Sequence, residues 1–497
     1  MTADRKAVDT GADRVGTSAY RGPAHPTESE ARSEKPVRFN AFQMNTPSHQ
    51  SPGLWRHPRN DSAGYANAGY WVELAQLLET GGFDAIFLAD VLGAYDVYGG
   101  SLDAALKHGV QLPLNDPLAL VPLIAHATTR LGIGVTAAVA YEHPYTFARR
   151  MSTLDHLSGG RVGWNIVTGY LDSAARNLGQ ERQLGHDQRY DLADEYLDVV
   201  YKLWEKSWDG DAVLRDRERG VYTDPARVHP INHRGQYYTV PGIHLCEPSP
   251  QRTPFLYKAG ASQRGLAFAA RHAEATFVSG PTKGIVQRYV ESARAAVQAA
   301  GRDPAALRVY AQALVIVGAT EAEARERLRE YEEHIDIEAS LTLLSGWTGV
   351  DFSRYGLDDT VEYIDTEAGR SALASLSVAD PSRRWTVREA ARFIGLGGRG
   401  PVIVGDAAQV TDQLVAWLDE TGIDGFNLAF ALPYEDMQGV VELVVPELKR
   451  RGRYRQDKES ATLREQLLGA GPHLAFEHPG RQVSIDTSID TTLRSAA

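Results

Sequence analysis

Cysteine is nearly absent from this sequence. The one cysteine among 497 residues, Cys246, excludes an internal disulfide and offers no ligand pattern for zinc or an iron–sulfur cluster, so we expect no metal site. No apolar run of about 18 residues occurs, which argues against a membrane-spanning helix. The first 36 residues also lack the apolar core of a signal peptide. These absences favour a protein of the reducing cytoplasm, and we expect residues 1–36 to form a disordered tail.

Positive charge is scarce relative to negative charge. The chain has 52 lysine and arginine residues against 64 aspartate and glutamate residues, which gives a net charge of −12. This balance argues against nucleic acid or an anionic membrane as the main partner. With 43% hydrophobic residues, the chain can instead bury a large core, as expected of a soluble globular protein.

Helix and strand patterns alternate along most of the chain. Phe147, Met151 and Leu154 share one helix face, Gly159 ends that helix, and an apolar strand then runs to Thr168. The same order of helix, stop and apolar strand recurs along the sequence. We count eight strands, at residues 37–43, 83–90, 131–140, 161–168, 254–260, 275–280 and 307–318 and within 418–430.

Eight strand-and-helix units predict a TIM (β/α)8 barrel over residues 37–455, with its active site at the carboxyl ends of the strands. Two irregular segments, 207–252 and 335–400, interrupt the alternation, and we interpret both as insertions that lie across this end as lids. Residues 456–497 form a C-terminal extension. The alternative is an open doubly wound sheet, but no G-x-G-x-x-G follows the first strand, as its dinucleotide site requires.

Several polar residues lie where a barrel site would form. Asp90 ends a strand, where a carboxylate either caps a following helix or binds a ligand. His186 and Tyr190 share a helix face and can reach one ligand, although Tyr190 alone is more typical of a core position. The string KAGASQRG, residues 258–265, leads a strand into a helix start, where free N–H groups can hold a phosphate. It follows the fifth strand, whereas barrel phosphate sites usually follow the last two.

Seven longer motifs occur in a fixed order. They are RFNAFQMNTPSHQSPGLWRHP, FDAIFLAD, STLDHLSGGRVGWNIVTGY, ARNLG, HDQRYDLADEYL, YKAGASQRG and SGWTGVDFS. Their joint order, over residues 37–454, resembles the flavin-dependent monooxygenases of the bacterial-luciferase superfamily. Within it, the sequence is most similar to the group that contains nitrilotriacetate, dibenzothiophene-sulfone and long-chain alkane monooxygenases and the pristinamycin synthase large subunit.

This resemblance implies a function. A separate NAD(P)H-dependent flavin reductase would supply reduced FMN, which would react with O2 to a flavin hydroperoxide and insert one oxygen atom into a small organic substrate. Members of the superfamily commonly form homodimers or homotetramers. Two alternatives stay open: a deazaflavin-dependent oxidoreductase of the same superfamily, and a non-catalytic barrel that binds flavin.

The resemblance also implies roles for particular residues. The positions that match the family's FMN contacts are Asp90, Thr136, Asn165, His186, Tyr190 and Ser262. His49 and Phe87 match substrate-side positions, and His49 is the catalytic candidate. One position departs from the pattern, because Trp347 stands where the sulfone-oxidising and alkane-oxidising members have a histidine. Neither substrate should therefore be assumed, and the indole should make the substrate wall flatter and more apolar.

Overall fold

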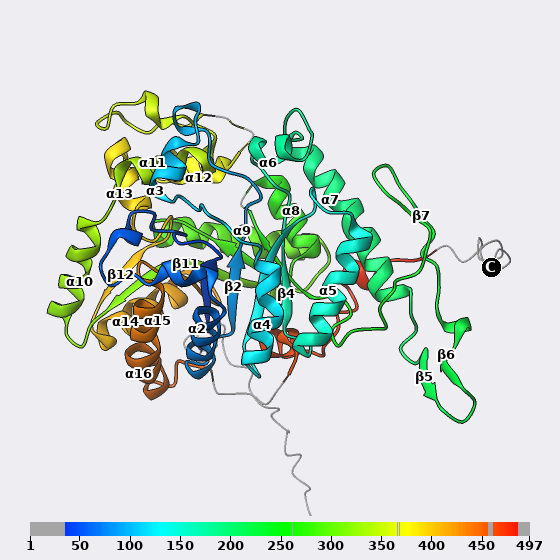
Figure 1. Ribbon diagram of the computed structural model, residues 1–497. Coiled ribbons are helices and arrows are strands. Elements are labelled where there is room, and N and C mark those ends of the chain that lie inside the picture. The colour runs from blue at the N-terminus through cyan, green and yellow to red at the C-terminus, as the bar shows by residue number, and fades with distance from the viewer. Residues whose placement is uncertain (1–34, 261, 365, 367, 456–460, 486–497) are drawn as a thin grey trace, which may run out of the picture.

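Eight parallel strands close into a barrel in the computed structural model, which describes residues 35–260, 262–364, 366, 368–455 and 461–485 (Figure 1). In chain order the barrel strands are β1 (Phe39–Met44), β2 (Ala85–Ala89), β3 (Gly132–Ala138), β4 (Val162–Val167), β9 (Phe255–Ala259), β10 (Ala275–Val278), β11 (Arg308–Val317) and β13 (Gly425–Ala429). The ring closes because β1 pairs with both β2 and β13, and β10 pairs with both β9 and β11. The predicted TIM barrel is confirmed, while the tail expected at residues 1–36 lies almost wholly outside the described residues.

Helices between the strands cover the outside of the barrel. They are α2 (Ala68–Thr80), α4 (Leu120–Ala127), α5 (Pro144–Ser158), α6 (Asp172–Asn177), α7 (His186–Tyr201), α8 (Gln263–His272), α9 (Lys283–Ala299), α10 (Glu321–Glu333), α14 (Ala407–Thr421), α15 (Pro433–Gly439) and α16 (Val445–Arg450). Short 3-10 turns are η1 (Leu54–Arg56), η2 (Ser62–Ala66), η3 (Tyr98–Gly100), η4 (Pro117–Ala119), η6 (Pro225–Arg227) and η7 (Pro304–Ala306), and π turns are η5 (Lys202–Lys206) and η9 (Val440–Val444). None of the described helices is both long enough and apolar enough to cross a bilayer.

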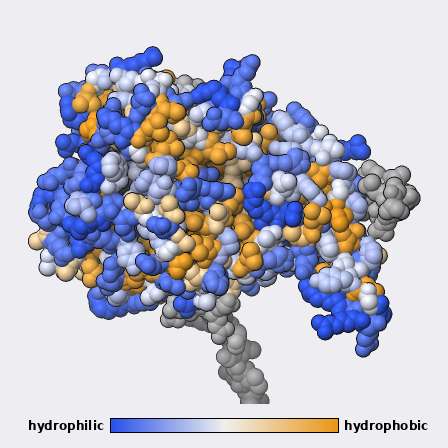
Figure 2. Space-filling model, viewed as in Figure 1, coloured by the Kyte–Doolittle hydropathy of each residue, from blue (hydrophilic) through white to orange (hydrophobic). Residues whose placement is uncertain are grey.

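Helix α5 illustrates how the sequence sets these elements. Pro144 occupies its first turn, and Gly159 ends it in the left-handed conformation at φ 63°, which glycine adopts at little cost. Phe147 and Met151 are buried on the barrel side, and the Phe147 ring lies 4.6 Å from that of Trp164 on β4. The predicted helix boundaries and apolar face are therefore confirmed. The outer face of α10 carries Glu–Arg ion pairs, and Figure 2 shows a largely hydrophilic surface there.

A ninth strand, β12 (Val402–Gly405), lies outside the closed ring. It pairs with the second half of the ten-residue β11, from Leu314 to Val317, whereas β13 pairs with the first half, from Tyr310 to Leu314. The sequence analysis missed β12, because four apolar residues directly after an irregular segment make a weak strand pattern.

The second insertion, residues 335–400, lies at the carboxyl ends of the strands and is partly helical. It contains α11 (Ile337–Thr348), η8 (Phe352–Arg354), α12 (Arg370–Ser375) and α13 (Val387–Ile394), and it packs on α3 (Asp103–His108) of the loop after β2. The expectation of an irregular segment was wrong for the stretches that form these helices. Nearly every residue of α11 is buried, so its apolar residues have no helical period that the sequence could display.

The first insertion, residues 207–252, is not a lid. Its two hairpins, β5 (Val213–Asp216) with β6 (Val221–Thr223) and β7 (His233–Arg234) with β8 (Thr239–Val240), extend to the side of the barrel (Figure 1). The segment packs on α5, where His244 Nε2 lies 2.9 Å from Ser152 Oγ. The prediction was wrong because a connection from a helix to the next strand runs at the amino ends of the strands, opposite the site.

The C-terminal extension closes the amino end of the barrel. Leu463 and Leu467 of α17 (Leu463–Leu468) pack inside the barrel against aromatic residues of β9 and β11. Arg464 lies beside them and pairs with Glu274 at 2.6 Å, with both side chains at most 4% exposed. The helix α18 (Pro479–Gln482) then packs near η5 and α7. Within the described part of the extension, residues 461–485, α17 therefore belongs to the barrel core and α18 to its outer surface.

Candidate active site

A cavity of about 400 Å³ opens at the carboxyl ends of the barrel strands. Strand ends, the loops after them and the second insertion all contribute to its wall, and no described residue of the first insertion does. All nine residues singled out from the sequence line it: His49, Phe87, Asp90, Thr136, Asn165, His186, Tyr190, Ser262 and Trp347. These nine residues come from seven separate segments of the chain, which therefore meet in one place.

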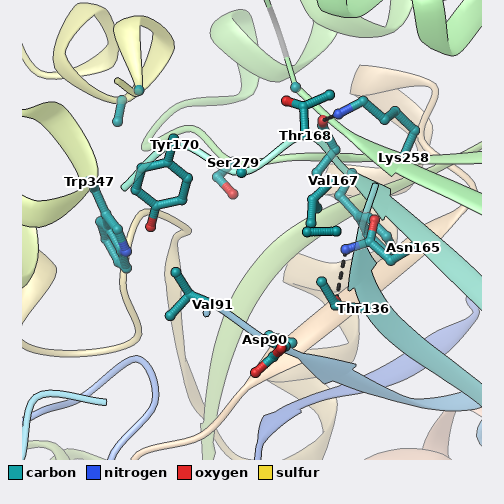
Figure 3. A pocket seen from close by; sticks show the side chains of 18 of the residues that line it. Asp90, Val91, Thr136, Asn165, Val167, Thr168, Tyr170, Lys258, Ser279 and Trp347 are labelled. Atoms are coloured by element: carbon teal, nitrogen blue, oxygen red, sulfur yellow. Dashed lines mark hydrogen bonds between the residues drawn. The ribbon is translucent and has the colours of Figure 1, made fainter. Parts of the chain in front are cut away.

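One wall is formed by β3 and β4. Thr136 and Asn165 are paired in register, and Asn165 Nδ2 donates to Thr136 Oγ1 at 2.9 Å (Figure 3). The other amide atom, Asn165 Oδ1, is buried and accepts no hydrogen bond from any described residue. An unsatisfied buried oxygen costs about 1–3 kcal/mol. This oxygen is available to accept a hydrogen bond from a ligand N–H group.

Asp90 directly follows β2, and Figure 3 shows it in the lower part of the picture. Burial, reinforced by the negative charge of Asp116, raises the pKa of its carboxyl to about 7. Of the two roles open to Asp90, helix capping is excluded, because the next helical turn along the chain begins at Tyr98. Near neutral pH this carboxyl can therefore either accept or donate a hydrogen bond in the cavity.

The opposite part of the cavity is suited to an anion. Ser262 caps α8, where its Oγ accepts from the N–H of Gly265 at 3.0 Å and lies 3.3 Å from His186 Nε2. Lys258, which the sequence analysis quoted but did not select, is 3% exposed, and its ammonium lies 5.5 Å from the centre of the Tyr190 ring. A lysine, two hydroxyls and a helix N-terminus thus converge.

Tyr190 combines the two roles weighed from the sequence. Its ring is 5% exposed and packs 5.4 Å from the ring of Phe268, as a core residue would. Its hydroxyl nevertheless reaches the turn before α8, since a Cβ placed on Gly265 would lie 2.9 Å from it. The absence of a side chain at Gly265 therefore leaves room for this hydroxyl beside the helix N-terminus.

A chain of hydrogen bonds holds His49 in the loop after β1. Ser279 Oγ donates to Gln312 Oε1 at 2.7 Å, Gln312 Nε2 donates to Gln50 Oε1 at 3.0 Å, and Gln50 Nε2 donates to His49 Nε2 at 3.0 Å. His49 Nδ1 must then carry the proton that points to the carbonyl of Phe42 at 3.3 Å. Burial lowers the pKa of His49 to about 3, so this imidazole is neutral.

The remaining wall is aromatic. Trp347 of α11 and Tyr170 from the loop after β4 face the cavity on the side away from Lys258 (Figure 3). The Tyr170 hydroxyl lies 3.1 Å from that of Tyr95, and the Arg399 guanidinium lies over the Trp347 ring, 5.6 Å from its centre. Tyr95 and Arg399 were missed from the sequence, because they come from segments without a regular pattern.

A closed (β/α)8 barrel with a cavity at the carboxyl ends of its strands is the arrangement in which TIM-barrel enzymes carry their active sites. The sequence pattern of the luciferase-like monooxygenases matches residues 42–425, and the chain belongs to this family. It is 45% identical over 450 residues to dimethyl-sulfide monooxygenase of Hyphomicrobium sulfonivorans, covering 90% of this chain and 94% of that protein. The predicted superfamily is therefore confirmed.

Two further relatives support this assignment. Long-chain alkane monooxygenase of Geobacillus thermodenitrificans is 46% identical over 437 residues, which cover 88% of this chain and 95% of that protein. The crystal structure of riboflavin lyase with modified FMN and its substrate riboflavin matches with a TM-score of 0.85 at 34% identity, over 90% of this chain and 99% of that one. The chain is thus a flavin-dependent monooxygenase by family.

Proposed function

We propose that this protein is the oxygenase component of a two-component system. It would bind reduced FMN, supplied by a separate NAD(P)H-dependent flavin reductase, and use O2 to oxygenate a small organic substrate. The observation that supports this most directly is the cavity itself, which has an anion-binding end at Ser262 and a buried, unpartnered oxygen at Asn165 on another wall. A cytoplasmic location and a homodimer or homotetramer are parts of the same proposal.

The residues present fit FMN. The phosphate would lie at the N-terminus of α8, with Ser262, Lys258 and the Tyr190 hydroxyl as donors. The flavin ring carries both N–H and carbonyl groups along one edge. Asn165 Oδ1 can accept from such an N–H, and Asp90, with a pKa of about 7, can serve as either partner. When bound in its reduced form, FMN would supply the activation of O2.

The protein's own part is to position the substrate and to exclude water. Apolar side chains of the strand ends, including Phe42, Phe87 and Phe277, line the cavity, and the second insertion contributes Trp347 above it. Excluding water would suppress side reactions of the bound cofactor and strengthen every polar contact inside the cavity. His49, whose Nε2 is occupied by Gln50, would orient the substrate as a neutral group.

Titration and oxygen uptake test this function. We expect the full chain to bind FMN and, with reduced FMN and an accepted substrate, to consume O2 and to form a product that contains one atom of it. Asn165→Ala should weaken FMN binding, whereas Gln298→Ala, an exposed position on α9, should leave it unchanged. Absence of FMN binding together with hydride exchange on a deazaflavin would replace the proposal by the alternative reading.

A further inference from the structure

Arg399 differs from the other interior cations of this protein. Its side chain lines the cavity, yet it forms no hydrogen bond or ion pair with any described residue. Its one recorded partner is the face of the Trp347 ring, 5.6 Å away. The N–H groups of this guanidinium are therefore available to donate hydrogen bonds to a ligand in the cavity.

Structural arginines in the same molecule look different. Arg161, 6% exposed, donates five hydrogen bonds of 2.8 to 3.1 Å to neighbouring oxygens. Arg464, equally deep, pairs with the carboxylate of Glu274. The guanidinium groups of Arg161 and Arg464 are thus satisfied by oxygens of the protein, whereas that of Arg399 faces the cavity without such a partner among the described residues.

No negative charge in the described chain offsets Arg399. Burial lowers the pKa of its guanidinium from the usual value, and the one titratable group that acts in the other direction is the phenol of Tyr170. Arginine nevertheless stays charged at any ordinary pH. A cation held at a cavity wall without a counter-charge lacks the partner that buried charges require.

Lys258, a second cationic side chain of the cavity, has different neighbours from Arg399. Lys258 donates to the carbonyl of Ala259 at 2.6 Å and lies near Tyr190, at the end of the cavity assigned to the FMN phosphate. Figure 3 places Lys258 on the opposite side of the cavity from Trp347, and the Arg399 guanidinium lies over the Trp347 ring. Of the three cationic side chains that line the cavity, Lys258 thus belongs to the wall that carries Tyr190 and Arg399 to the wall that carries Trp347, while Arg189 is the third.

We propose that the substrate is an organic carboxylate, whose anionic group is bound by Arg399 and whose apolar body lies against Trp347 and Tyr170. The inference deepens the proposed function and rests on it for the assignment of this wall to the substrate. A carboxylate matches the planar guanidinium with two parallel hydrogen bonds. Trp347 contributes by holding the guanidinium through its ring face, which a protonated histidine at this position would instead repel.

Matched neutral and anionic probes test the proposal. Phenylacetate and (phenylthio)acetate would be titrated calorimetrically into the full chain loaded with oxidised FMN, and each would be compared with its amide. We expect each carboxylate to bind at least roughly 10-fold more tightly than its amide, the lower end of the effect of a hydrogen bond to a charged group. Arg399→Met should abolish this ratio, and Arg399→Lys should retain part of it, because the charge stays but the fork is lost.

The controls separate the other roles of Arg399. The proposal is overturned if no carboxylate binds more tightly than its amide, if Arg399→Met weakens both members of a pair equally, or if it weakens FMN instead. The first outcome would show that the cavity has no site for a carboxylate. The second would show that Arg399 only stabilises the second insertion, and the third that it contacts the flavin. Repeating the titration without FMN measures the same ratio independently, so failure of the flavin function would be recognised separately.

Discussion

At the scale of single residues, the polar side chains of the cavity are oriented by the protein before any ligand binds. The chain from Ser279 through Gln312 and Gln50 to His49 runs in one direction, because each amide uses its N–H towards the next acceptor. His49 therefore keeps its proton on Nδ1 and does not exchange one through Nε2 while this chain is intact. Its proposed catalytic role is best described as substrate positioning.

Asp90 leads to a prediction about pH. The raised pKa, about 7 against an ordinary 3.8, means that the folded protein binds this proton more tightly than the unfolded chain does. Ionised Asp90 therefore lowers stability, and its cost grows from about pH 4 up to about pH 7. We expect Asp90→Asn to gain stability relative to the unmodified protein over this range, by at most about 4 kcal/mol. Urea unfolding of both proteins without FMN, at several pH values, measures the difference, and a difference independent of pH would contradict it.

A second prediction distinguishes the residues proposed to bind the cofactor from those proposed to contact the substrate. Trp347→His removes apolar area and the ring face beside Arg399, so the range of oxygenated substrates should change while FMN affinity stays nearly constant. Asp90→Ala and Tyr190→Phe should do the reverse, each costing roughly 0.5 to 3 kcal/mol of FMN binding through a lost hydrogen bond. FMN titration and substrate turnover on all three variants give the comparison. If Trp347→His lowers FMN affinity as much as Asp90→Ala does, the assignment of the Trp347 wall to the substrate is wrong.

At the scale of elements, the proposed phosphate site at the N-terminus of α8 can be tested through its capping residue. Ser262 is both its cap and a cavity residue, and aspartate and asparagine are equally good caps. Ser262→Asp should therefore keep the helix but repel the phosphate, weakening FMN binding by about a few kcal/mol at an effective dielectric near 20. Ser262→Asn is the matched neutral control and should bind FMN far better than Ser262→Asp. Equal FMN affinity in both variants would move the phosphate away from α8.

At the scale of the whole molecule, the barrel has one open end and one sealed end. The second insertion forms part of the cavity at the carboxyl end, while α17 fills the amino end with Leu463 and Leu467. The buried pair of Arg464 and Glu274 ties this helix to the segment between α8 and β10. Stability and ligand binding are thus placed at opposite ends, as in other barrels of this type.

This separation predicts that a substitution at the sealed end changes the stability of the protein without changing its affinity for FMN. Glu274→Gln leaves Arg464 buried without a counter-charge and should lower the free energy of unfolding by about 3 to 5 kcal/mol. Because the pair lies at the sealed end, FMN affinity of the folded variant should not change. Urea unfolding and FMN titration on the same preparation test both parts. Glu465→Gln, next to the pair on the same helix, is a control that should cost much less.

The sequence by itself determined the local elements and the alternation that defines the barrel. Helix α5 was predicted with its ends because Pro144, Gly159 and a period of apolar residues act within a few turns of chain. The motif order also predicted nine residues that line the cavity, although their individual roles remain predictions.

Only the tertiary structure decided what depends on contacts between distant segments. It showed that residues 207–252 lie beside the barrel, that nearly every residue of α11 is buried, and that α17 seals the amino end. It also placed Arg399 on the ring of Trp347 without a counter-charge. None of these features has a local signal, because burial on all sides removes the periodicity of a helix, and a charge is paired or unpaired only once its neighbours in space are known.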